Sequence, residues 1–445
     1  MTPGASTDSA QSGAGDPQQS GGASNTSQTG ANGPQDTFSH PEKLPPLNLF
    51  SEATGNTGLT LFTSVGTLVQ RVSETRSTSY WQTLAAVNGG ISISQYRPAL
   101  LWSFTYNGGT NLSSTSGYYN TSLSQAGNAR IAWNFAKRWQ LRIKDNYLYS
   151  NDPFQPFLTY LGQPTPNNPN PVVYIPNAIV AQNTGNIDVS YRLAAHDTVN
   201  FSGGESFQHF IRGYNAQWNS FTYSGGVFYQ HDFSARFSGG GGYLFQAIDF
   251  GHGTSRAGVN WFQGFATYQF SPRLQVSGWV GPELTHTKDL IPIFCSQYGC
   301  LVEVEHRGSW NVAEGGTLTW QVAPGNALGL QVAHQITNGG GLLGIARTYQ
   351  GALTYSRPLT RAWSLGLGLL YNDSLSESAF RAAQYLKSWA GTAGFGRKVF
   401  NDAWSFNAYY AYIRQSSNFF GRPSTGSSNG LGLSLSYAWN HALGR

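Results

Sequence analysis

Cys295 and Cys300 are the only cysteines of the chain, and four residues separate them. Thiols this close in sequence could close a loop as a disulfide in an oxidising compartment, or bind a metal if further ligands lay nearby. Imidazoles and carboxylates that could complete a divalent-cation site occur in the same stretch: His286, Asp289, Glu303, Glu305 and His306. We favour a disulfide in a solvated polar loop over free thiols or a metal site.

Two other patterns could indicate an enzyme. Gly339, Gly341 and Gly344 have the spacing of a dinucleotide-binding fingerprint, but no helical pattern follows them, so we expect a surface loop. Histidines that could act as general bases lie on different predicted strands without a catalytic signature: His209, His231, His252 and His334. We therefore predict no catalytic residues and no cofactor, and keep an interfacial hydrolase as a minor alternative because a triad is spatial.

A recurring sequence corner predicts the elements that carry these residues. In ATYQFSPRLQVSG (266–278), apolar and polar residues alternate on both sides of Ser-Pro-Arg, which predicts a strand, a tight turn and a strand. Pro272 lacks an N–H, so the corner should lie outside the sheet. Similar corners occur at 134–143, 231–237, 355–365 and 398–406. Aromatic residues flank them, which is typical of a membrane interface.

The pattern predicts eighteen strands, with sixteen as the fallback because the first strand is weakly marked. They are expected near 58–71, 81–95, 99–107, 120–135, 139–149, 185–193, 197–207, 219–233, 235–248, 255–270, 273–285, 308–322, 326–336, 346–356, 362–371, 384–397, 402–414 and 430–439. Short connections follow the even-numbered strands and long or polar ones the odd-numbered strands. This alternation is typical of an outer-membrane barrel.

The two faces of the predicted strands differ in polarity. In the last strand Leu431, Leu433 and Leu435 alternate with Gly432 and Ser434, which suits lipid on one side and a wet interior on the other. A soluble sandwich would carry charges on its outer face, yet charged residues are only 11% and aromatic residues 14%. The fold class expected is all-β, a transmembrane antiparallel up-and-down β-barrel.

Other classes of protein are excluded by composition. No apolar run approaches the roughly 18 residues that a membrane-spanning helix needs. The net charge of +5 is spread along the chain without a basic block, so we expect no nucleic-acid partner.

The chain resembles bacterial outer-membrane β-barrels of the porin-like kind over about residues 58–439. Its last strand is similar to the terminal assembly signal of that class, with Gly432, Leu435 and Tyr437 at the glycine and hydrophobic positions. Residues 440–445 follow the aromatic Trp439, where such chains commonly stop. The resemblance implies contact with outer-membrane lipid and recognition of the C-terminal strand by the barrel-assembly machinery.

Two regions are expected. Residues 1–57 are rich in Ser, Gly, Gln and Pro with scarcely an apolar side chain, which predicts a disordered tail. Residues 58–445 should form the barrel. An even strand number places both ends on the short-turn side, the periplasm in such proteins, so the tail should lie there. We expect neither a secretion signal nor a lipid-anchor cysteine at the start of this chain.

The loop 150–186 is too apolar for disorder and is stiffened by prolines. Its aromatic residues include Phe154, Phe157, Tyr160 and Tyr174. We expect the loop to fold into the barrel mouth as a constriction; an external flap packed on neighbouring loops is the alternative.

Charged residues beside this loop should face the interior. Strand parity directs the cations Arg130, Arg142, Lys144 and Arg192 inward, and Asp188 partly offsets them. An excess of positive charge along a pore predicts a mild preference for anions.

The function expected is an outer-membrane channel for passive diffusion of small polar solutes. The alternatives are an exopolysaccharide export conduit and a non-conducting scaffold barrel. A polar, uncharged lining with interspersed Tyr would suit sugars, whereas an acidic polymer would need a continuous basic track that the sequence does not show. The identity of the solute and the oligomeric state stay open.

Overall fold

The computed structural model of the protein describes residues 57–74, 79–97, 99–115, 118–150, 179–211, 219–251, 254–296, 299–338, 344–377, 384–399, 403–419 and 422–442. All statements about structure below concern these residues. No helix among them is long and apolar enough to cross a membrane.

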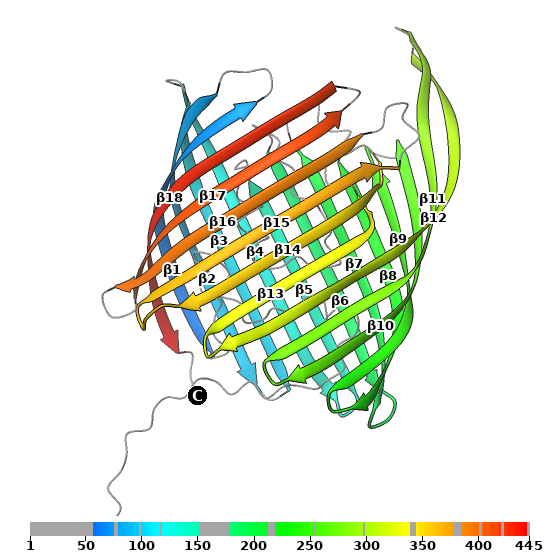
Figure 1. Ribbon diagram of the computed structural model, residues 1–445, viewed down its shortest axis with the longest axis horizontal. Coiled ribbons are helices and arrows are strands. Elements are labelled where there is room, and N and C mark those ends of the chain that lie inside the picture. Colours follow the sequence, from blue (N-terminus) through cyan, green and yellow to red (C-terminus); the bar gives the residue numbers. More distant parts are fainter. Residues whose placement is uncertain are drawn as a thin grey trace, which may run out of the picture. The chain divides into compact units, whose positions relative to one another are not determined.

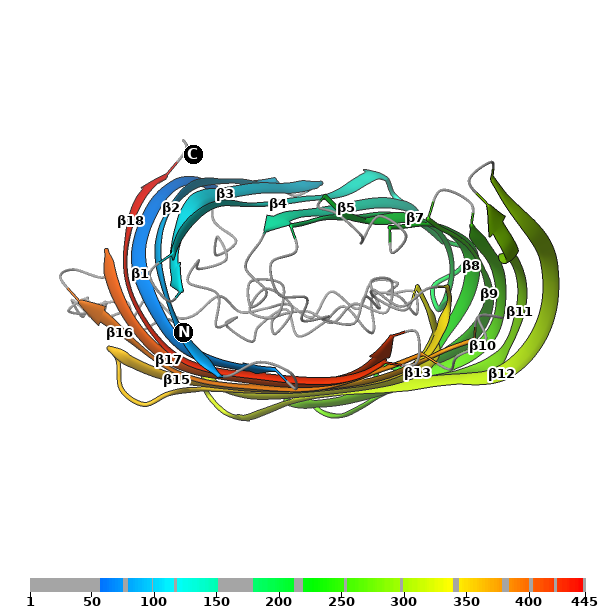
Figure 2. The ribbon, with the colours of Figure 1, turned by 90° about the horizontal axis from the view of Figure 1, so that it is seen from above.

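Eighteen antiparallel strands form a single sheet. They are β1 Gly58–Glu74, β2 Tyr80–Arg97, β3 Leu100–Thr115, β4 Tyr118–Ala136, β5 Trp139–Ser150, β6 Val180–Arg192, β7 Asp197–Phe210, β8 Ser220–Ser234, β9 Phe237–Phe250, β10 Ser255–Ser271, β11 Leu274–Ser296, β12 Gly299–Ala323, β13 Asn326–Thr337, β14 Ala346–Pro358, β15 Trp363–Ser376, β16 Tyr385–Val399, β17 Trp404–Phe419 and β18 Arg422–Ala442. Each strand pairs with its sequence neighbours, and β18 pairs with β1. The sheet is therefore a closed up-and-down barrel (Figures 1 and 2).

The eighteen predicted strands are all confirmed, and so are the short connections after the even-numbered strands. At the other end of the barrel, where long or polar connections are predicted, three connections are short. Only two residues join β3 to β4, β11 to β12 and β17 to β18. The largest difference is the β11–β12 hairpin, which is paired through the segment 286–307 predicted as a loop. Strands that continue beyond the apolar belt need no apolar face, so hydropathy did not mark them.

The outer face of the barrel is apolar and aromatic. In β18, Leu431 is 57% exposed and Leu433 41%, as the alternation predicted. Aromatic rings gather at the short turns. Stacked and tilted pairs include Phe135–Trp139, Trp139–Tyr191, Phe233–Phe237, Tyr268–Phe270 and Trp404–Tyr437, with ring centroids 4.4–6.1 Å apart. These rings form the predicted aromatic girdle.

A polar row interrupts this apolar surface on β5 to β7. Asp145, Gly185 and Glu205 are register partners on the outer face. Asn183 Nδ2 donates a hydrogen bond of 2.8 Å to Asp145 Oδ1. Charges on the lipid face of a barrel are unfavourable, by about 2–4 kcal/mol for cations at mid-depth and less for carboxylates. This row is therefore the part of the outer face least suited to lipid tails.

The inner face is mainly polar and uncharged, with Ser, Thr, Asn and Gln at the buried alternate positions. It is not polar throughout, because two apolar clusters also lie on it. One joins β15, β16 and β17 to β1 and β2 and contains Leu68, Leu370 and Ile413. The other gathers on β8, β9 and β10 around Phe228 and Ile248.

Glycines on β9 make room for the second cluster. A Cβ atom at position 242 would lie 2.2 Å from Cδ1 of Phe228, the register partner of Gly242 on β8. The Phe228 ring therefore fills the space that a side chain would otherwise take. Gly242 thus permits the close approach of a ring from β8.

The residues after Trp439 continue the last strand. Asn440 and His441 pair with Thr60 and Leu59 of β1. The Oγ1 of Thr60 also donates a 2.7 Å hydrogen bond to Oδ1 of Asn440. This extension therefore belongs to the seam that closes the barrel.

Candidate functional site

Four of the five charged residues predicted to face inward lie side by side on β4, β5 and β6. Arg130 and Lys144 are register partners, and so are Arg142 and Asp188. Asp188 interacts electrostatically with both Lys144 and Arg142. The positions share the face that carries the buried Ser190. Among the described residues, three cations and one carboxylate make up this patch, called the basic cluster below.

The fifth residue does not join the basic cluster. Arg192 lies four residues beyond Asp188 on β6, at the short-turn end. Its backbone N–H donates to the carbonyl oxygen of Arg138 at 2.9 Å, and its side chain is exposed. Arg192 thus belongs to the rim of the barrel.

The interior is accessible to solvent next to the basic cluster. Asn128 and Asn146 are register partners that are also joined by a side-chain hydrogen bond. They occupy the inward positions adjacent to Arg130 and Lys144, away from the short turn. Both are exposed although they face inward. A hydrated space therefore borders β4 and β5.

The wall splits between β12 and β13. Their pairing ends at Glu314 and His334, beyond which β12 continues with β11 alone and β13 with β14 alone. The β11–β12 hairpin rises above the rim (Figure 1). The tip of the β13–β14 hairpin instead turns into the barrel.

This tip lies inside the ring, against β8 to β10. Ile336 and Ile345 belong to one buried cluster with the inner-face residues Phe228 and Leu244, and both isoleucines are at most 1% exposed. Asn338 Nδ2 donates a 3.1 Å hydrogen bond to the Ser220 hydroxyl of β8. Figure 2 shows the yellow end of the hairpin on the inner side of the wall. The hairpin tip therefore narrows that end of the barrel.

Glu283 of β11 holds the tip where the wall splits. The backbone N–H of Ile336 donates to both carboxylate oxygens of Glu283, at 3.0 and 3.1 Å. Glu283 has no exposed surface, and the side chains of Asn311 and Trp261 approach the same carboxylate. Glu283 thus supplies the acceptor that β12 no longer offers to β13. The sequence analysis did not identify Glu283, because a single carboxylate at an inward position of a strand forms no recognisable motif.

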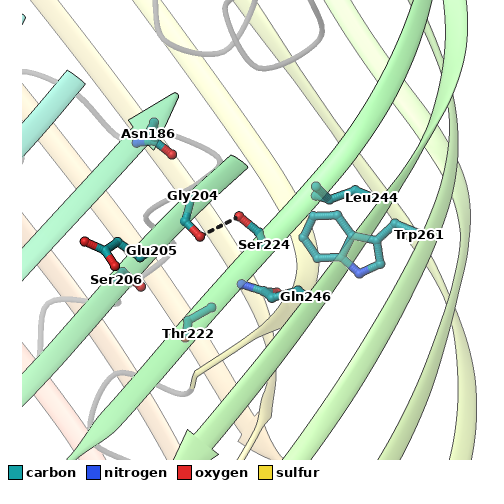
Figure 3. Close-up of a pocket in the computed structure, with 9 residues that line it drawn as sticks. All are labelled: Asn186, Gly204, Glu205, Ser206, Thr222, Ser224, Leu244, Gln246 and Trp261. Atoms are coloured by element: carbon teal, nitrogen blue, oxygen red, sulfur yellow. Dashed lines mark hydrogen bonds between the residues drawn. The ribbon is translucent and has the colours of Figure 1, made fainter. Parts of the chain in front are cut away.

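A recess in the inner wall lies where β6 to β10 run side by side (Figure 3). It is lined by Asn186, Gly204, Glu205, Ser206, Thr222, Ser224, Leu244, Gln246 and Trp261. Glu205 occupies an outward position of β7, and its Cγ would be 3.4 Å from a Cβ at the outward Gly185. The side chains that face the recess are therefore uncharged. The regular polar alternation was visible in the sequence, but the hollow was not.

The candidate metal ligands divide between the two faces of the β11–β12 hairpin. Asp289 and Glu305 are register partners, whereas His286 and His306 occupy positions of the opposite parity. In the described part of the chain no three His, Cys, Asp or Glu side chains form a group that could hold a metal ion. Glu303 lies on the same strand as Glu305, two positions away.

The backbone places Cys295 and Cys300 opposite each other as register partners. The disulfide between them stays a prediction. The predicted constriction residues Phe154, Phe157, Tyr160 and Tyr174 lie outside the described residues, as do residues 1–56, Gly339, Gly341 and His252.

Three of the four candidate histidines, His209, His231 and His334, are described and lie on separate strands. His231 Nδ1 is 2.8 Å from Asp197 Oδ1 at a short turn, and the Tyr229 hydroxyl also bonds to that carboxylate. His209 is on β7 and His334 on β13, where its ring stacks on Tyr349. Within the described residues, no serine hydroxyl is hydrogen-bonded to the His231–Asp197 pair.

A closed barrel with an aromatic, apolar exterior and a polar interior defines an outer-membrane β-barrel protein of the porin-like type. No protein-family model matches the chain, and no curated protein is similar to it in sequence. Solved structures with a similar fold include OccK1 (OpdK) of Pseudomonas aeruginosa, with 10% identity, a TM-score of 0.40, and coverage of 86% of this chain and 99% of that one. OccK2 (OpdF) of the same organism, crystallised with glucuronate, has 10% identity and a TM-score of 0.37 over 85% of this chain and 98% of that one. OccAB3 of Acinetobacter baumannii has 8% identity and a TM-score of 0.37 over 86% and 99%.

Proposed function

We propose that the protein is an outer-membrane channel through which small polar solutes diffuse passively. The observation that carries this proposal is the accessible inner face at Asn128 and Asn146, because a sealed barrel would bury inward side chains. The inner wall offers hydroxyl and amide groups along its length. Such groups replace the hydration of a passing polar solute.

The basic cluster gives this channel a mild anion preference. Fixed charges at a wall of low dielectric raise the local concentration of counter-ions. Arg130, Arg142 and Lys144 outweigh Asp188 beside the accessible space. The chemistry is transport without bond making, so no residue acts as a catalyst.

The hairpin tip of β13–β14, packed against β8 to β10, acts as a constriction. The part of the predicted loop 150–186 that lies between β5 and β6 adds a second one from the mouth, with Phe154, Phe157, Tyr160 and Tyr174 as its apolar contacts. The tail of residues 1–57 lies in the periplasm, on the side of the short turns. Barrel insertion uses the C-terminal strand as the signal for the assembly machinery.

A planar-bilayer recording of the purified full chain tests the proposal. We expect stepwise increases of current in KCl when the protein is added. A non-conducting scaffold would insert without current, and that result would overturn the proposal. Passage of a long polysaccharide together with current would instead favour an export conduit.

A further inference from the structure

Basic residues form a row on the outer face of β10 to β12, at the end of the barrel away from the short turns. Arg256 of β10, Lys288 of β11 and His306 of β12 follow one another as register partners. All three side chains are exposed, whereas the alternate positions Ala257 and Thr287 are buried on the inner side. Neighbouring strands lie about 4.8 Å apart, so these long side chains can reach one small anion.

Glycines flank the next outward position towards the short turns. His286 of β11 lies there between its register partners Gly258 and Gly308. Among the described atoms, a Cβ at Gly308 would have only the carbonyl oxygen of Thr285 within 4 Å, at 3.9 Å. The surface at Gly308 is therefore hollow, and basic side chains border it on three strands. These side chains are called the outer basic patch below: Arg256, His286, Lys288 and His306.

Acidic residues lie mainly on the other face of the β11–β12 hairpin. Asp289 and Glu305 are register partners on the face opposite to the outer basic patch. On the outer face, Asp249 of β9 is the register partner of Arg256, whose Nε donates to Asp249 Oδ2 at 2.9 Å. This bond engages one of the five guanidinium donors, so Arg256 can still donate to a second anion.

The outer basic patch lies at the edge of the apolar belt. Leu284 and Trp310 are register partners next to it on the outer face, 40% and 69% exposed. Strand β10 has 17 residues, which at about 3.3 Å per residue and a tilt of about 40° rise roughly 43 Å, against an apolar band of about 25 Å. Arg256 is the second residue of β10, at the end far from the short turn. The patch is therefore level with lipid headgroups, where exposed Trp side chains are also common.

We propose that the outer basic patch binds the phosphate group of a lipid headgroup in the outer leaflet, with the acyl chains of that lipid against the apolar surface beside Trp310. A phosphate offers several acceptor oxygens and up to two negative charges, which suits donors that converge from three strands. The proposal rests on the orientation given above, with the short turns in the periplasm. It goes beyond the channel function and holds whether or not the barrel conducts.

Lipid binding to the purified full chain in dodecyl maltoside micelles tests the patch. The probe is diphosphoryl lipid A, and the comparison ligands are dephosphorylated lipid A and inorganic phosphate. Native mass spectrometry across a titration gives the dissociation constants. The variants are Arg256→Gln, Lys288→Gln, both together, and Gly308→Leu. The matched control Arg273→Gln removes an exposed cation from the short turn between the same strands, β10 and β11. Heat-modifiable migration in electrophoresis verifies that each variant is folded.

We expect diphosphoryl lipid A to bind, and Lys288→Gln to weaken this binding about fivefold, the effect of one basic residue near an anionic headgroup. Arg256→Gln should weaken it at least as much, because the charge of Asp249 is then left uncompensated. The double variant should lose about thirtyfold. Gly308→Leu keeps every charge but fills the hollow, so it should also weaken binding. Arg273→Gln should bind like the unmodified chain.

Equal binding of dephosphorylated lipid A, or equal losses in Arg273→Gln and Lys288→Gln, would overturn the proposal. Inorganic phosphate that displaces the lipid at equal concentration would also overturn it, because the site would then take the free ion. Unaltered binding in Gly308→Leu would show diffuse attraction in place of a defined site. Lipid binding with the expected order of variants but no ion current would support the patch and contradict the channel.

Discussion

At the scale of single residues, charge at the inner wall depends on which side chains neutralise one another. Asp188 is the register partner of Arg142 and also interacts with Lys144. Arg130 lies on the far side of Lys144, opposite it on β4. Among the described residues, the cations therefore outnumber the carboxylate at the β4–β5 pair, next to the accessible Asn128 and Asn146.

Replacing Arg142 and Lys144 together by Gln should weaken the anion preference. Two fixed charges are lost beside Asp188, so the patch changes from net positive towards neutral or negative. The measurement is the reversal potential in a KCl gradient. The effect should be larger near 0.1 M than near 1 M salt, since the Debye length falls from about 10 Å to about 3 Å.

Arg192→Gln is the matched control, because this cation lies at the rim outside the basic cluster. It should shift the reversal potential less than the double variant does. Cation preference in the unmodified protein, or an unchanged potential in the double variant, would contradict the assignment.

At the scale of elements, the split between β12 and β13 gives two neighbouring hairpins different surroundings. The β11–β12 hairpin extends away from the barrel rim, and the β13–β14 hairpin ends in an apolar cluster inside the ring. Leaving a ladder exposes backbone groups that need new partners. For Ile336 that partner is the Glu283 carboxylate.

Glu283→Ala should release the hairpin tip. An unsatisfied buried N–H costs about 1–3 kcal/mol, enough to change the population of the closed position of the tip. We expect a larger and noisier single-channel current. Glu283→Gln keeps an acceptor oxygen for Ile336 and should remain close to the unmodified protein. Equal currents in the Ala and Gln variants would show that this contact does not hold the tip.

At the scale of the whole molecule, one seam turns a sheet into a barrel. β1 pairs with β18 over the whole length of β1, from Gly58 with Ala442 to Glu74 with Gly426. No other pair of strands in this barrel is so distant in sequence. The residues after the terminal aromatic contribute the last part of this seam.

Deleting residues 440–445 should lower the stability of the barrel. The deletion removes the ladder partners of Leu59 and Thr60 and the Thr60–Asn440 side-chain bond. Each hydrogen bond contributes about 1 kcal/mol, so a decrease of a few kcal/mol is expected. The temperature at which electrophoretic mobility changes measures it. Asn440→Ala keeps the backbone hydrogen bonds between β1 and β18 and should cause a smaller decrease. If the deletion variant is as stable as the full chain, residues 440–445 have no role in closing the barrel.

The sequence by itself determined the number of strands, their order and the face that each residue occupies. Every strand of a membrane barrel has lipid on one face and water on the other. Apolar and polar residues therefore alternate along each strand with a period of two residues. Leu431 and Leu433 face outward, and Arg142 and Lys144 face inward, for this local reason alone. The aromatic corners similarly marked the short turns.

Only the tertiary structure decided where the wall splits, which hairpin enters the ring and where the recess lies. These features depend on contacts between strands far apart in sequence, such as Glu283 with Ile336 and Asn338 with Ser220. Outside the apolar belt, alternation no longer distinguishes strand from loop, which is why the β11–β12 extension was not predicted. The sequence pattern of a polar inward residue is the same whether the residue borders open water, a hairpin tip or the hollow at Gly204. Its surroundings depend on which residues the closed sheet places near it.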